Sequence, residues 1–158
     1  MTRAEENQRA EEIAERTVRY LRKKEATTRK VYVVIFGTRH FRDYKLFERE
    51  VTKFLKKVKK AEKLPQERII IIEGEAAGAD KMAVRYALEY GYNYKPYPAD
   101  WKRFGKRAGM LRNEEMKVQA EWGIGFWDGV SPGTKMMIGI CEPKMGEQLK
   151  VIQYREDK

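Results

Sequence analysis

Residues 30–36 read KVYVVIF and lead directly into Gly37-Thr38-Arg39. This run is rich in β-branched residues and almost wholly apolar, which is typical of a strand buried on both faces of a parallel sheet. A second such run, residues 68–73 (RIIIIE), ends in the same way at Gly74. A helix-like pattern follows each run, so the chain is predicted to alternate strands with helices.

The same alternation continues outward from these two runs. The pattern predicts further strands at residues 93–98, 122–127 and 149–154, and helices at residues 44–63, 81–90, 108–120 and 132–141. Asp80 is expected to cap the helix at residues 81–90. Ser131 is expected to cap the helix at residues 132–141, and Pro143 is expected to end it. Five strands with intervening helices predict a Rossmann-like three-layer α/β sandwich whose sheet is mostly parallel.

The first thirty residues differ from the rest. Residues 3–25 are highly charged and carry a narrow apolar stripe at helical spacing, formed by Ala10, Ile13, Ala14, Val18 and Leu21. We therefore predict a charged helical extension over residues 1–29 and one domain over residues 30–158. The extra helix is expected to pack on that domain or on a second subunit.

Composition narrows the class of protein. The chain has 158 residues, 37% of them charged, and a formal net charge of +10. One cysteine, Cys141, and the absence of a membrane-length apolar run predict a cytoplasmic protein, which for a phage protein means the cytoplasm of its host. The many Lys and Glu residues are frequent in thermophile proteins. The positive charge favours anionic partners, which include nucleic acid, nucleotides and acidic membrane surfaces. No membrane partner is predicted.

The residues that follow the strands predict a binding site. Ligands of open α/β sheets lie beyond the carboxyl ends of the strands, where glycines allow close backbone approach and helix N-termini attract phosphate. Hydroxyls and arginines add hydrogen bonds. The predicted ligand-binding residues are Gly37, Thr38, Arg39, Gly74, Glu75, Gly78, Asp80, Asp100, Arg112, Asn113, Ser131, Gly133 and Thr134.

Each of these loops taken singly has a structural explanation as well, because tight turns need glycine whatever they bind. None is a Walker A loop or a G-x-G-x-x-G fingerprint. Arg112 is placed in the first turn of its helix, where its charge opposes the helix dipole, and this favours a binding role. His40 is the only histidine and has no partner ligand in the sequence, so no metal site is predicted.

These motifs together resemble the YspA-like branch of the SLOG superfamily, which includes the DNA-processing protein DprA and the Lonely Guy phosphoribohydrolases. The matching stretches are Gly37-Thr38-Arg39 with Asp43, residues 74–80, 98–101 and 105–109, Arg112-Asn113 with Met116, and residues 127–134. The resemblance covers about residues 31–154. It implies a Rossmann-like sheet and a pocket for a nucleotide or nucleotide-derived ligand, with no cofactor beyond such a ligand.

One residue departs from the Lonely Guy pattern. That pattern places a glutamate three residues after the Gly-Thr of the last loop, where this chain has Met137. A thioether neither activates water nor stabilises a developing cation, so the resemblance implies binding more than N-glycosidic cleavage. Glu75 also stands where relatives often carry glycine.

Three functions remain open from the sequence. The first is a sensor or binding domain for a nucleotide-derived ligand. The second is a nucleotide hydrolase, with Glu73, Glu75, Asp100 and Asp128 as candidate acids or bases. The third is a nucleic-acid-binding module that uses the cations and aromatics of residues 101–107. A homodimer is also expected, through the N-terminal helix or the exposed ends of the methionine-rich helices that carry Met116, Met136 and Met137.

Overall fold

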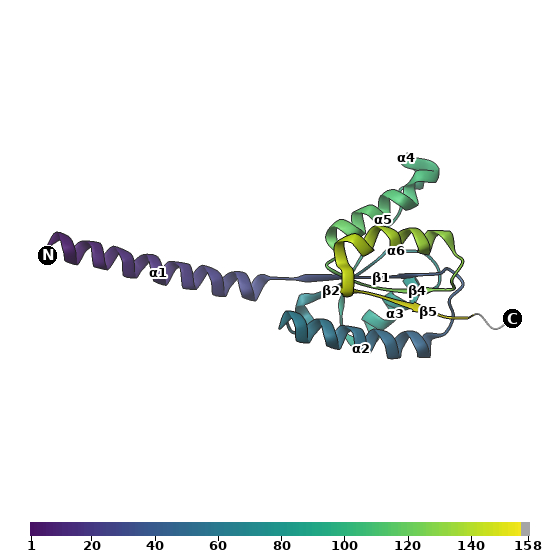
Figure 1. Ribbon diagram of the computed structural model, residues 1–158, viewed down its shortest axis with the longest axis horizontal. Helices are drawn as coiled ribbons and strands as arrows, with labels where there is room; N and C mark the ends of the chain where they lie inside the picture. The colour runs from purple at the N-terminus through teal and green to yellow at the C-terminus, as the bar shows by residue number, and fades with distance from the viewer. Residues whose placement is uncertain (156–158) are drawn as a thin grey trace. The chain divides into compact units, whose positions relative to one another are not determined.

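The chain forms two compact units, Met1–Lys30 and Val31–Lys158. The structure, a computed structural model, describes residues 1–155, apart from the side chains of residues 25–27. The first unit contains one continuous helix, α1 (Arg3–Thr28) (Figure 1). Each of its described side chains is exposed. Within residues 1–155, no helix combines the length and apolar character needed to cross a membrane.

The second unit is built on a five-stranded parallel sheet. Its strands are β1 (Val31–Gly37), β2 (Ile69–Glu73), β3 (Asn93–Pro96), β4 (Trp122–Trp127) and β5 (Leu149–Gln153), in the order β3-β2-β1-β4-β5. Val33 lies opposite Ile71 on one side and Trp122 on the other. Every pairing is parallel, so the prediction of an α/β sandwich with a mostly parallel sheet is confirmed. The strand order reverses between β1 and β4, where open α/β sheets form their ligand crevice.

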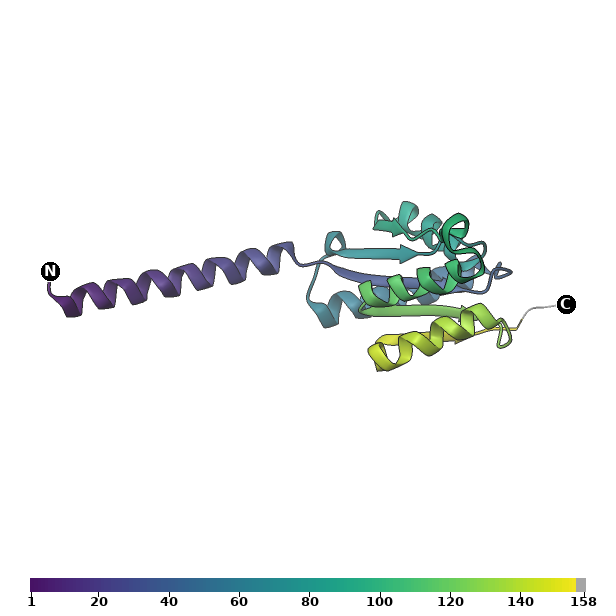
Figure 2. The same ribbon diagram turned by 90° about the horizontal axis from the view of Figure 1, so that it is seen from above.

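Helices cover both faces of the sheet. On one face, α2 (Tyr44–Glu62) and α3 (Ala79–Tyr90) pack against Val33 and Ile35 of β1. On the other face, α5 (Ala108–Gln119) and α6 (Pro132–Met145) pack against Val34 and Phe36 (Figures 1 and 2). Successive side chains of a strand point to opposite faces, so an unbroken apolar strand such as β1 requires both layers.

Phe36 lies at the carboxyl end of β1, directly before the loop that follows this strand. A Cβ atom on Gly125 of β4 would lie 2.4 Å from Cζ of the Phe36 ring, so the ring occupies the space that a side chain at residue 125 would take. Phe36 is 5% exposed and is the last side chain before Gly37. The ring is therefore held in one place by packing against the neighbouring strand.

The segment after β3 is more ordered than the sequence indicated. Residues 99–107 lie between the strand predicted at 93–98 and the helix predicted at 108–120, and they contain the short helix α4 (Trp101–Phe104) and a 3₁₀ turn, Gly105–Arg107. The Asp100 carboxylate accepts a hydrogen bond from the Arg103 N–H at 3.1 Å and so caps α4. A helix this short depends on its cap, and the aspartate supplies it.

The predicted end of α6 is wrong. We expected Pro143 to end the helix near Cys141, whereas α6 continues to Met145 with Pro143 inside it. Met145 is 5% exposed in the core, and the Lys144 ammonium donates to the carbonyls of Lys117 (2.7 Å) and Val118 (2.8 Å) at the end of α5. These contacts offset the hydrogen bond that proline cannot donate.

The expectation that exposed methionines mediate self-association is wrong for two of the three residues. Met116 of α5 and Met137 of α6 are each 2% exposed and belong to the core between these helices and the sheet. Methionine fills irregular spaces in a core because its side chain is unbranched and flexible. Neither residue offers an accessible surface to a partner.

Candidate functional site

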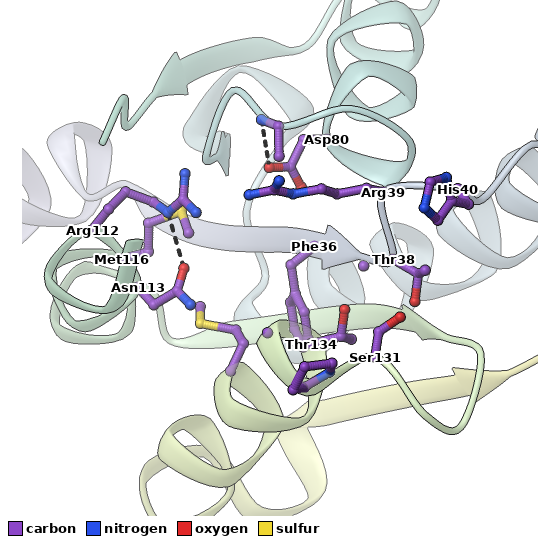
Figure 3. A pocket seen from close by; sticks show the side chains of 15 residues that line it. Phe36, Thr38, Arg39, His40, Asp80, Arg112, Asn113, Met116, Ser131 and Thr134 are labelled. Carbon is purple, nitrogen blue, oxygen red and sulfur yellow. Dashed lines mark hydrogen bonds between the residues drawn. The ribbon is translucent and has the colours of Figure 1, made fainter. Parts of the chain in front are cut away.

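A pocket of about 330 Å³ lies beyond the carboxyl ends of β1 and β4 (Figure 3). It opens where the strand order reverses, at the position that the fold class predicts. The structure brings together these predicted site residues around it: Gly37, Thr38, Arg39, Asp80, Arg112, Asn113, Ser131, Gly133 and Thr134. The other predicted residues, Gly74, Glu75, Gly78 and Asp100, do not line it.

The loop after β1 forms one wall. Gly37 has no room for a side chain, because a Cβ there would lie 2.5 Å from the Phe126 carbonyl oxygen. Thr38 is 2% exposed, and its hydroxyl oxygen accepts a hydrogen bond from the Asp128 N–H at 3.3 Å. The exposed Arg39 side chain extends beside Asp80 on the pocket side of the loop (Figure 3). The wall therefore presents a fixed hydroxyl and a solvent-accessible cation.

The N-terminus of α6 forms the opposite wall. Ser131 is the N-cap and Pro132 the first helical residue, as predicted, but the Ser131 hydroxyl donates to Asp128 Oδ2 (2.7 Å) and does not cap the helix amides. The first intrahelical bond runs from the Lys135 N–H to the Ser131 carbonyl at 3.1 Å. The amides of Gly133 and Thr134 therefore precede the helical ladder, at the positive end of the helix dipole.

Asp128 organises the turn that leads into α6. Its carboxylate accepts hydrogen bonds from the N–H groups of Val130 (2.9 Å) and Ser131 (2.7 Å). Burial alone would raise the pKa of Asp128, but these hydrogen bonds outweigh it and the pKa is lowered. Asp128 is therefore an ionised turn residue, which does not suit the general-acid role considered from the sequence.

Arg112 reaches the pocket from α5 and is half-buried. Its Nη1 donates to the Gly74 carbonyl, and its Nε donates to Asn113 Oδ1 at 3.0 Å. A Cβ on Gly74 would lie 2.6 Å from Nη1, so this glycine makes room for the guanidinium. Burial lowers the pKa of Arg112, and the nearby Asp80 carboxylate opposes that shift. Because α5 begins at Ala108, Arg112 lies beyond its first turn, and the predicted conflict with the helix dipole is wrong.

Asp80 holds the loop after β2. It is 5% exposed, and Oδ2 accepts from the N–H groups of Gly74 (3.2 Å) and Ala76 (3.1 Å). Its predicted role as a helix cap is wrong, because Gly78 occupies the N-cap of α3. Burial raises the pKa of Asp80, while those hydrogen bonds and Arg112 act in the opposite direction.

Gly78 brings the loops after β1 and β2 into contact. Its φ of +72° is unfavourable for a residue with a side chain, and a Cβ there would lie 2.3 Å from the Thr38 carbonyl oxygen. Glu75 has a φ of +57° and an exposed side chain outside the pocket lining. Gly78 thus serves packing between loops, which is the structural explanation that the sequence had left open.

The floor of the pocket is apolar, and sequence reasoning missed it as part of the site. Phe36, Met116 and Met137 line it, and each is at most 5% exposed. Phe36 is the last side chain of β1 before the glycine turn, so the strand-to-loop position was the available signal. The pocket therefore offers polar walls and an apolar base, the usual composition of a small-molecule site.

Glu73 is the last residue of β2, directly before the loop that starts at Gly74, and it is 1% exposed. Burial raises its pKa from 4.5 to about 7, while the hydrogen bond from the Glu75 N–H partly opposes the shift. Between these values the folded protein holds a proton that the unfolded chain has released, so stability falls as the pH rises from about 4.5 to about 7.

Glu73→Gln is expected to remove this pH dependence and to raise the thermal midpoint at pH values above about 7, because the amide needs no proton to stay neutral. Thermal unfolding across this pH range would measure the difference between the variant and the wild type. Parallel curves for the two proteins would contradict the assignment of the shift to Glu73.

No cluster of His, Cys, Asp and Glu suited to a metal ion occurs among the described residues. The carboxylate that lines the pocket belongs to Asp80. His40 lies at the outer rim with an exposed side chain (Figure 3). The polar part of the lining thus combines hydroxyls, helix amides and guanidinium groups with the Asp80 carboxylate.

Comparison with known proteins agrees with this geometry. Residues 31–104 match the model of the YspA, cpYpsA-related SLOG family. A curated relative, the Gene 61 protein of Mycobacterium phage D29, is 40% identical over 73 residues, which cover 42% of this chain and 58% of the relative. The chain thus spans little more than half of that relative's length. No solved structure matches the chain significantly.

The family match includes β1, β2 and the loops that carry Thr38, Arg39 and Asp80. Arg112 and the N-terminus of α6 lie beyond it, and the fold brings them to the same pocket. Over residues 31–104 the chain is similar to the YspA-like branch of the SLOG superfamily, which supports the resemblance seen in the sequence.

Proposed function

We propose that the pocket binds a nucleotide or another nucleotide-derived phosphate ligand and that the protein acts as a sensor or binding domain. The observation that carries the proposal is the convergence of two hydroxyls, a helix N-terminus and two arginines above an apolar floor. These groups come from Thr38 and Thr134, α6, Arg39 and Arg112. The proposed setting is the cytoplasm, where nucleotides are abundant.

The polar wall suits a phosphate. The amides of Gly133 and Thr134 offer hydrogen bonds at the positive end of the α6 dipole, and Arg39 adds a full positive charge. The Thr134 side chain is only 7% exposed and lines the pocket, where its hydroxyl can hydrogen-bond to a phosphate oxygen.

The apolar floor suits the remainder of a nucleotide. A base or ribose can pack on Phe36, Met116 and Met137, while inorganic phosphate alone would leave that surface unused. The volume of about 330 Å³ lies near the lower end of the range of roughly 300–1,000 Å³ for ligand pockets. A compact nucleotide therefore fits better than a large one.

The lining favours binding over hydrolysis. The Asp80 carboxylate already accepts two loop amides, and Met137 presents a thioether where the Lonely Guy pattern places glutamate. Neither group is suited to activating water. Incubation with nucleoside monophosphates and detection of free base or phosphate would reveal a hydrolase.

One observation favours the nucleic-acid alternative. Trp101 and Phe104 of α4 are 52% and 41% exposed, beside Lys102 and Arg103, and none of them lines the pocket. Exposed aromatics among cations suit stacked bases and phosphates. A gel shift with single-stranded DNA at low salt tests this surface separately from the pocket.

Calorimetric titration tests the main proposal. We expect a nucleoside monophosphate or diphosphate to bind, and inorganic phosphate to bind more weakly at the same site because it leaves the floor empty. Phosphate should compete with the nucleotide. If phosphate, AMP, ADP and ADP-ribose all fail to bind the folded protein, the proposal is wrong.

Gly133→Ala is expected to separate ligand binding from stability. A Cβ at this position meets nothing within 4 Å, so no packing within the protein requires glycine. Alanine in α6 should raise the free energy of unfolding by about 0.5 kcal/mol. The same methyl group would lie in the polar wall of the pocket, where the phosphate is proposed to bind. A clash of this kind costs about 1–3 kcal/mol, so nucleotide binding should weaken about tenfold or more.

Gly139→Ala provides the matched control. Gly139 also lies in α6, and a methyl group at this position would have nothing within 4 Å, but Gly139 does not line the pocket. The variant should show a similar gain in stability with unchanged affinity. Equal affinity of the wild type and Gly133→Ala would exclude the α6 N-terminus as the phosphate site.

A further inference from the structure

The unit Met1–Lys30 has exposed apolar residues that do not line the pocket. Its helix α1 exposes Ile13 (55%), Val18 (46%), Tyr20 (63%) and Leu21 (55%). Together with Ala10, Ala14 and Thr17, these residues occur at helical spacing along one face. Most helices in proteins are stabilised by packing of such a face, so the exposed stripe indicates a partner.

The charges of α1 are divided along its length. Residues 3–15 carry five acids and two cations, Arg3 and Arg9, whereas residues 16–24 carry five cations and no acid, and Glu25 follows them. The acidic residues are Glu5, Glu6, Glu11, Glu12 and Glu15; the cations of the second half are Arg16, Arg19, Arg22, Lys23 and Lys24. Two copies of this helix in antiparallel orientation would place Glu12 and Glu15 of one copy beside Arg16 and Arg19 of the other.

We propose that α1 pairs with α1 of a second copy of the chain in an antiparallel arrangement. A twofold axis between Glu15 and Arg16 would place Ala10 opposite Leu21 and Ala14 opposite Thr17. Small residues opposite larger ones allow the two helices to approach closely. The same register places Glu12 opposite Arg19 and Glu15 opposite Arg16 near the twofold axis. Farther from the axis, Arg9 lies opposite Arg22 and Glu6 opposite Glu25, so the complementary charges are those of the central turns.

A parallel pair is disfavoured by the same charges. It would place Glu12 and Glu15 beside their own copies and Arg16 and Arg19 beside theirs, and like charges at flanking positions oppose pairing. Glu12 with Arg16 and Glu15 with Arg19 also have the spacing that stabilises a single helix. The experiments therefore need to separate pairing between chains from support within one helix.

Sedimentation equilibrium of the full chain tests the pairing. The wild type should approach twice its monomer mass of 18.7 kDa as its concentration rises, and high salt should weaken the association. Glu12→Arg with Glu15→Arg should be monomeric, and so should Arg16→Glu with Arg19→Glu. An equimolar mixture of these two variants should form heterodimers, and all four changes in one chain should restore the homodimer.

Circular dichroism and thermal unfolding show whether each variant is folded, so that a loss of dimer is not confused with a loss of structure. Each variant should keep the melting transition of the unit Val31–Lys158, because the substitutions lie outside it. A wild type that stays monomeric at every concentration overturns the proposal. So do half-swapped variants that dimerise as well as the wild type, or a monomeric chain that binds vesicles of anionic lipid through α1.

Cysteine crosslinking determines the direction of the helices. Ala10 and Leu21 are about 16 Å apart along the axis at 1.5 Å per residue, so in an antiparallel pair neither residue meets its own copy. Ala10→Cys mixed with Leu21→Cys should form a disulfide between chains, while Ala10→Cys alone should not. The native Cys141 is buried and should not react. Efficient crosslinking of Ala10→Cys to itself would show a parallel pair and overturn the proposal.

Discussion

Gly78→Ala is expected to lower the free energy of unfolding by about 3 kcal/mol or more. Two costs add at this position. The φ of +72° is strained for any residue with a side chain, at about 1–3 kcal/mol, and the new methyl would lie 2.3 Å from the Thr38 carbonyl oxygen, where overpacking costs a further amount of about 1–3 kcal/mol. Denaturant unfolding followed by circular dichroism measures the loss.

Gly105→Ala is the matched control for strain alone. Gly105 has φ and ψ of 56° and −133°, close to the 72° and −123° of Gly78, but a methyl group at Gly105 would have nothing within 4 Å. The variant should lose about 1–2 kcal/mol of stability, from strain only. If both variants lose the same stability, the contact between the two loops contributes nothing and our explanation of Gly78 is wrong.

Arg112→Lys is expected to weaken nucleotide binding by about tenfold to a hundredfold. Lysine retains the charge and can still donate to the Gly74 carbonyl, but it lacks the planar fork that pairs with two phosphate oxygens. Hydrogen bonds to charged groups contribute about 1.5–3 kcal/mol, which corresponds to this range of affinity. Calorimetric titration with the ligand found for the wild type measures it.

Arg103→Lys is the control for this variant. Arg103 lies on the exposed helix α4 with its guanidinium 5.1 Å from the centre of the Phe104 ring, and it does not line the pocket. Its replacement should leave the affinity for a small nucleotide unchanged. An Arg112→Lys variant that is stably folded and binds as tightly as the wild type would remove this arginine from the proposed site.

The layers and the sheet were predictable because their signals are local. Unbroken apolar runs such as residues 31–36 identify parallel strands, and the glycines at the ends of β1, β2 and β4 mark the edge of the sheet where the pocket lies. The family match over residues 31–104 agrees with that assignment. Long helices with strong periodicity were likewise placed within a few residues of their ends.

Two of the errors arose where contacts distant in sequence decide the structure. Pro143 failed to end α6 because Met145 packs in the core and Lys144 bonds to α5. The error at Asp80 has a local cause, because its carboxylate accepts from amides of the preceding loop and not from those of α3. The apolar floor was missed because Met116 and Met137 come from different helices, and only the fold brings them beneath one pocket.

The contact at Gly78 affects how fast a ligand can bind to the pocket. Because the loops after β1 and β2 touch through backbone atoms, and Asp80 fixes the second loop, neither can move without disturbing the other. The walls are thus preorganised, and little conformational entropy should be lost on binding. We expect a single fast association phase, limited by diffusion and accelerated by Arg39, with no slower step of loop closure.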